Sequence, residues 1–90
     1  MDKVLEKAKE LRLAIEDTPE FKEYMKNKEL LEKSEDVIEL KHEIANLRAK
    51  GKTIEADRLE VFYKNHPAVN NYEASKEALY QLLKTIESLL

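Results

Sequence analysis

The chain has 90 residues, of which 42% are hydrophobic and 39% are charged, and it contains one Gly, two Pro and no Cys. The absence of Cys excludes disulfides, thiolate metal sites and thiol nucleophiles. The net charge of −3 comes from 16 basic and 19 acidic residues of interspersed sign, which argues against DNA binding and disfavours direct RNA binding. This composition favours long helices, and the length predicts one small domain spanning residues 1–90.

The first expected helix carries a narrow apolar stripe and ends before a clear helix start. Residues of this stripe recur at intervals of three or four positions: Val4, Ala8, Leu11 and Ile15. Thr18 can cap the next helix, and Pro19 suits its first position, where the missing N–H costs nothing. A second helix is therefore expected to begin at Pro19.

A third helix and a fourth helix are expected on either side of the single Gly. Ser34 is the expected cap of the third helix, and Gly51 follows basic residues in the way that a helix C-terminus often does. Thr53 can cap the fourth helix, whose apolar stripe is expected to consist of Ile54, Val61 and Phe62. Because Gly51 and Ile54 continue the register of the third helix, one long rod through Gly51 is the alternative.

The stretch KNHPAVNNYEA, residues 64–74, is interpreted as a corner between two helices. Pro67 cannot continue the preceding helix and pushes His66 towards an extended conformation. Asn70 and Glu73 have the spacing of a capping box, so the last helix is expected to start at Pro67 or Asn70. With breaks near Thr18, residues 33–34, Gly51 and residues 66–67, the sequence predicts an all-α bundle of four to five helices without strands.

The pattern of residues predicts neither an enzyme nor a bound cofactor or metal. Glu39 and His42 have the Glu-x-x-His spacing of di-iron bundles, but the second copy of the motif is missing. His42 is expected to be solvated and His66 to be a turn residue, and no catalytic residue is assigned. The sequence shows neither a Gly-rich phosphate loop nor zinc spacing. No segment approaches the roughly 18 apolar residues of a membrane span, and we expect no membrane insertion.

Six apolar residues are candidate contacts with a partner or a second copy. Leu13, Leu59, Tyr63 and Tyr80 lie away from the expected stripes, and Leu82 and Leu89 widen the apolar stripe of the last helix. The core of a 90-residue chain is thin, so docking against another chain would add burial that the monomer lacks. A homodimer is therefore expected. The alternative, in which these residues form a second side of the same core, stays open.

The order of these segments resembles the YlbF/YmcA/YheA-like family of small bacterial helical proteins. The likeness covers nearly the whole chain, from the first apolar stripe through DTPEFKEY (residues 17–24) and the Gly51 turn to NHPAVNNYEASKEALYQLLKTI (residues 65–86). The resemblance implies an all-α fold, frequent dimerisation and no known catalytic residues. It also implies regulation through protein–protein assembly, in bacterial competence, sporulation, biofilm formation or RNA processing.

Two departures and two alternatives qualify what the resemblance implies. Some members carry a cysteine-bearing tail linked to iron–sulfur clusters, and because this chain has no Cys, that role is not carried over. The segment around Gly51 is also shorter than in several relatives. A non-enzymatic cytoplasmic regulator with a protein partner is the main expectation. A structural dimerisation module and a weak RNA-binding protein are the alternatives.

Overall fold

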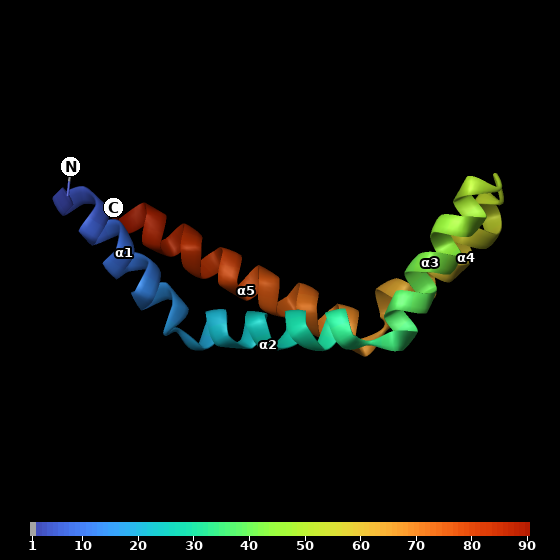
Figure 1. Ribbon diagram of the computed structural model, residues 1–90, viewed down its shortest axis with the longest axis horizontal. Helices are drawn as coiled ribbons and strands as arrows, with labels where there is room; N and C mark the ends of the chain where they lie inside the picture. The colour runs from blue at the N-terminus through green and yellow to red at the C-terminus, as the bar shows by residue number, and fades with distance from the viewer. Residues whose placement is uncertain (1) are drawn as a thin grey trace.

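The computed structural model describes residues 2–90, which form five α-helices and no strand (Figure 1). The helices are α1 (Asp2–Glu16), α2 (Pro19–Lys33), α3 (Glu35–Ala49), α4 (Thr53–Asn65) and α5 (Pro67–Leu89). The predicted all-α fold is confirmed. The helices are also interrupted at the four places expected from the sequence.

The turn at Gly51 separates α3 from α4 and excludes one continuous rod. Gly51 has a φ of +75°, a left-handed conformation that an L side chain disfavours. The Lys52 N–H donates to the Leu47 carbonyl at 2.9 Å, and the Gly51 N–H donates to the Arg48 carbonyl at 3.1 Å. These two bonds form a Schellman motif, which satisfies the last carbonyls of α3 and reverses the chain.

The expected caps of α2, α3 and α4 are only partly found. Thr18 caps α2 as predicted, because its Oγ1 accepts from the Phe21 N–H at 3.2 Å and Pro19 follows in the first turn. Ser34 stands at the N-cap of α3 but forms no side-chain capping bond. The prediction for Thr53 is wrong, since α4 is preceded by Lys52 and Thr53 is already helical.

The start of α5 also differs from the capping box expected at Asn70. The helix begins at Pro67, and His66 is its N-cap in an extended conformation. The His66 Nδ1 accepts a hydrogen bond from the Ala68 N–H at 3.1 Å. Because Pro67 fixes a helical φ and His66 satisfies a free N–H, the helix starts three residues before Asn70.

The helices build an elongated molecule rather than a sphere. α2 and α5 run antiparallel in the middle, the α3–α4 hairpin leaves at one end, and α1 with the last turns of α5 forms the other end (Figure 1). The principal extents are 54 × 24 × 22 Å and the radius of gyration is 18.1 Å. A compact chain of this length would have a radius of gyration of about 12 Å, so much of this chain lies far from any shared core.

The core is small and lies where α2, α3 and α5 meet. Its buried apolar residues are Leu31, Val37 and Val69, and Tyr63 and Tyr72 pack against them while remaining partly exposed. A second buried point lies at Ala56 in the α3–α4 hairpin, where the exposed fraction is 0%. The thin core expected for this length is therefore distributed over two contacts.

The expectation that Ile54, Val61 and Phe62 form the packed side of α4 is wrong. Ile54 and Phe62 are 72% and 67% exposed, and Val61 is exposed as well. The packed side consists instead of Ala56, with the half-buried Leu59 and Tyr63. Ala56 allows α3 and α4 to approach closely, and this approach turns the larger side chains outward.

Candidate functional site

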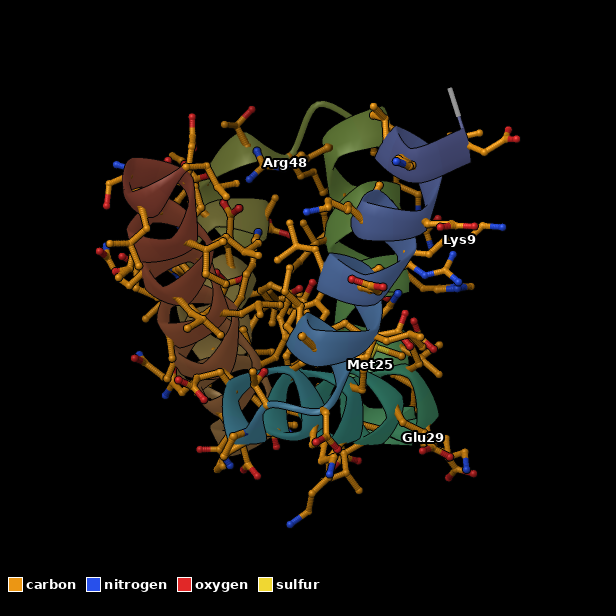
Figure 2. All side chains as sticks on the ribbon, turned by 90° about the vertical axis from the view of Figure 1, so that its left-hand side faces the viewer. Lys9, Met25, Glu29 and Arg48 are labelled. Carbon is orange, nitrogen blue, oxygen red and sulfur yellow. The ribbon has the colours of Figure 1, made fainter. Side chains whose placement is uncertain are left out.

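Apolar side chains gather without cover at the end of the molecule formed by α1 and by residues 76–90, which we call the open end. Neither α1 nor residues 76–90 contain a buried residue. Figure 2 looks onto this end and shows α1 and α5 on opposite sides of it. The large apolar side chains exposed here are Val4, Leu5, Leu11, Leu13, Tyr80, Leu83, Leu89 and Leu90. The open end is therefore a candidate protein-binding surface.

Four of the six candidate contact residues lie at this open end. Leu13 of α1 is 59% exposed, and Leu89 near the end of α5 is 80% exposed. Tyr80 is also exposed, with the Lys84 ammonium 4.9 Å from the centre of its ring, and Leu82 is half-buried. The fold thus brings residues from the two ends of the sequence to one end of the molecule.

The other two candidates, Leu59 and Tyr63, lie on α4 and are half-buried. Tyr63 packs against the core, and the Lys41 ammonium lies 5.7 Å from the centre of its ring. The hairpin exposes other large apolar side chains: Ile38, and the three residues of the stripe expected on the fourth helix, Ile54, Val61 and Phe62. The sequence does contain a pattern that predicts this exposure, since Ala56, Leu59 and Tyr63 also recur at helical spacing and leave Ile54 on the outer side of the helix.

An open groove of about 640 Å³ crosses α3 on the hairpin. Its apolar lining comes from Ile38 and Leu40 of α3 and from Leu59 of α4, where Leu40 and Leu59 are half-buried. The charged lining consists of three carboxylates and one histidine: Asp36, Glu39, Glu43 and His42. At 100° per residue the three carboxylates lie between Leu40 and Ile38 on α3, so the groove has an apolar side at Leu40 and Leu59 with acidic residues next to it and neither Lys nor Arg in its lining.

One of the basic residues near the Gly51 turn, Arg48, forms ion pairs within the hairpin. Arg48, which Figure 2 labels, donates to Glu60 at 2.7 Å and to Asp57 at 3.2 Å. These contacts join the end of α3 to α4. A guanidinium already paired with two carboxylates of its own chain offers little to an external anion, so Arg48 is not a good phosphate contact.

The titratable groups show little sign of catalytic chemistry. The Lys33 ammonium 2.6 Å from Glu29 (labelled in Figure 2) lowers the pKa of that carboxyl, but both side chains are exposed and such pairs contribute little stability. His42 is exposed on α3. Within residues 2–90 we find no cluster of three or more His, Asp or Glu side chains that could hold a metal ion.

One tyrosine pair connects α2 to α5. The Tyr24 and Tyr72 hydroxyls lie 3.4 Å apart, and their ring centres are separated by 5.6 Å. The hydrogen bond to Tyr24, with some desolvation, raises the pKa of Tyr72 to about 12. Asn27 adds a second link, since its Nδ2 donates to the Asn71 carbonyl at 3.3 Å. These polar contacts fix the pairing of α2 and α5.

In residues 2–90 no helix combines the length and the apolar character that crossing a bilayer requires. The longest helix, α5, carries charged residues along its length, including Glu73, Lys76, Glu77 and Lys84.

The comparisons with known proteins give one match. A search of curated proteins and a search of solved structures both return no match. A family model described as "Control of competence regulator ComK, YlbF/YmcA" matches residues 4–90. The matched range runs from the start of α1 through both ends of the molecule to the last residue. The chain therefore belongs to the YlbF/YmcA family of competence regulators.

Proposed function

We propose that this protein is a non-enzymatic regulator that acts by binding other protein chains, beginning with a second copy of itself. The family description supports the regulatory part of the proposal. The open end supports the binding part, because large apolar side chains from α1 and α5 are left in water there. Contiguous exposed apolar surface on a small protein is typical of an interface.

The observation that carries the proposal is the absence of any buried residue in α1 and in residues 76–90. These segments together make up about a third of the chain. Helices gain most of their stability from packing an amphipathic face, and an isolated helix of 15 residues is marginal in water. A second chain that covers Leu83 and Leu89 would supply the packing that the monomer lacks.

The working role that follows is assembly into a regulatory complex in the bacterial cytoplasm. The paired charges on the helices keep the remaining surface soluble, while the open end offers apolar contact. The resemblance to regulators of competence, sporulation, biofilm formation and RNA processing gives the setting in which a partner would be sought. A partner protein would bind the homodimer rather than a single chain.

The test is the mass of the protein in solution as a function of concentration. We expect a dimer by sedimentation equilibrium, and a wild-type chain that stays monomeric at about 100 μM would contradict self-association of about 5.5 kcal/mol or more. Tyr80→Glu and Leu89→Glu place a charge at the open end and should weaken the dimer at least about tenfold. Ser88→Glu adds the same charge to the outer side of α5 and is the control.

The regulatory part has its own experiment. Cross-linking of the tagged protein in bacterial cells, followed by mass spectrometry, should identify a defined partner complex that Leu89→Glu abolishes and Ser88→Glu retains. A dimer without any such partner would instead favour a structural dimerisation module. Binding to RNA whose affinity falls steeply with salt would favour the third alternative.

A further inference from the structure

The groove on α3 has the composition of a site for one kind of helix. Its apolar side is formed by the half-buried Leu40 and Leu59, and next to Leu40 on α3 come the carboxylates of Asp36, Glu39 and Glu43. The nearest basic residue on this part of α3 is Lys41, which lies over the Tyr63 ring and lines a different depression. A helix that fits this groove needs an apolar stripe with a positive charge on the side that meets these carboxylates.

α1 has this pattern. Val4, Leu11 and Ile15 lie within about 40° of one another around the helix, at 100° per residue. The nearest charged residues on the two sides of the stripe are Lys7 and Arg12, about 60° and about 80° from its centre. The carboxylates of α1, including Glu16, which pairs with Arg12 at 3.4 Å, lie further round the helix. The apolar stripe of α1 therefore has basic flanks.

The stripe is also free to bind. Val4 is 73% exposed and Leu11 is exposed as well, while Ile15 at the α2 junction is half-buried. Figure 2 shows Lys9 pointing to the outer side of α1, away from α5. The N-terminal two-thirds of α1 thus offers an uncovered apolar stripe together with Lys7.

We propose that the groove on α3 binds α1 of a second copy of this chain. The proposal rests on the self-association proposed above and names the two surfaces that meet. α1 and α3 lie towards opposite ends of a molecule 54 Å long (Figure 1). Two copies arranged antiparallel about a twofold axis can therefore form the contact twice, with each α1 in the groove of the other copy.

Apolar burial and charge have different tasks in this contact. Burial of Val4 and Leu11 against Leu40 and Leu59 supplies affinity. The match between Lys7 and the carboxylates beside Leu40 fixes the orientation and rejects chains with acidic flanks. The acidic residues of α1 point away from the groove, so docking does not place like charges together.

A charge exchange tests the contact in the full-length protein. Lys7→Glu and Glu39→Lys, each at an exposed position, should raise the dimer Kd by about tenfold, because a twofold dimer contains each substitution twice. The double variant, with both changes in one chain, should return to within about twofold of the wild-type Kd. Lys9→Glu carries the same change of charge on the outer side of α1 and should leave the Kd unchanged.

The outcomes separate this proposal from self-association itself. If Tyr80→Glu weakens the dimer while Lys7→Glu and Glu39→Lys do not, the groove contact is wrong and the dimer stands. If both charge reversals weaken the dimer but the double variant does not recover, the pairing is also wrong. A wild-type chain that stays monomeric at about 100 μM overturns both proposals. Circular dichroism of each variant checks that the helical content is retained.

Discussion

The two ends of this molecule each consist of a pair of helices, but one pair is closed and the other is open. In the α3–α4 hairpin the helices pack along their length around the fully buried Ala56, and Arg48 bridges them. At the open end, α1 and the last turns of α5 lie on opposite sides and bury no residue (Figure 2). A single chain therefore packs α3 against α4 by itself, but it leaves α1 and the last turns of α5 without such a partner.

The difference has two physical causes. A three-residue connection with a Schellman motif at Gly51 holds α3 and α4 together, and a small residue at position 56 allows close approach. α1 and the end of α5 come from the two ends of the chain, and no short connection joins them. Closing such a pair costs chain entropy that a thin apolar contact does not offset, so a second chain is the alternative source of burial.

The largest expected effect comes from a substitution that forces the closed pair apart. Ala56→Leu inserts three heavy atoms where the exposed fraction is 0%, and we expect the free energy of unfolding to fall by about 2–3 kcal/mol. The measurement is denaturant unfolding followed by circular dichroism. Ala14→Leu makes the same change at an exposed position of α1 and should alter stability by less than about 0.5 kcal/mol. Equal losses in the two variants would contradict the contrast between the ends.

The helices themselves could be predicted from the sequence because residues at or next to each boundary determine where the helix begins or ends. Pro19 after Thr18, the single Gly and Pro67 after His66 each end or start a helix by their own backbone preferences. The caps were predicted less well. Asn70 and Glu73 have the spacing of a capping box, but His66 and Pro67 start the helix three residues before Asn70.

The packed side of α4 could not be predicted by the same means. Two apolar stripes of similar strength run along this helix, and size alone favours Ile54, Val61 and Phe62. The choice depends on the partner helix, because only the side with Ala56 lets α3 approach closely. The groove on α3 depends equally on this choice, since it needs Leu59 beside Leu40.

An intermediate effect is expected at the junction that leads from the hairpin to α5. His66→Ala removes the acceptor of the Ala68 N–H and should lower the free energy of unfolding by about 1 kcal/mol. Asn70→Ala, at the position of the expected capping box, should change it by less than about 0.5 kcal/mol, because Asn70 lies inside α5. Thermal unfolding of both variants gives the comparison. A larger loss for Asn70→Ala would restore the capping box and displace His66.

The smallest effect is expected in the middle of the molecule, where Tyr24 and Tyr72 join α2 to α5. The pKa of Tyr72 is raised from 10 to about 12, so the folded state holds this proton more tightly than the unfolded state. The stability that this bond contributes is complete below about pH 10 and is lost as the pH rises through 12. Tyr24→Phe should therefore lower stability by less than about 1 kcal/mol at pH 8, and its difference from wild type should shrink towards pH 11.5.

Absorbance titration would measure the pKa of Tyr72, and thermal unfolding across this pH range would measure how the stability changes with pH. In Tyr24→Phe the titration of Tyr72 should move to lower pH, because the hydrogen bond from the Tyr72 hydroxyl to Tyr24 is the main cause of the raised pKa. Tyr80→Phe is the matched control, since it removes a hydroxyl from an exposed ring at the open end. A difference between wild type and Tyr24→Phe that stays constant from pH 8 to pH 11.5 would show that the two hydroxyls are not coupled. The pairing of α2 with α5 would then depend on the apolar core and on Asn27 alone.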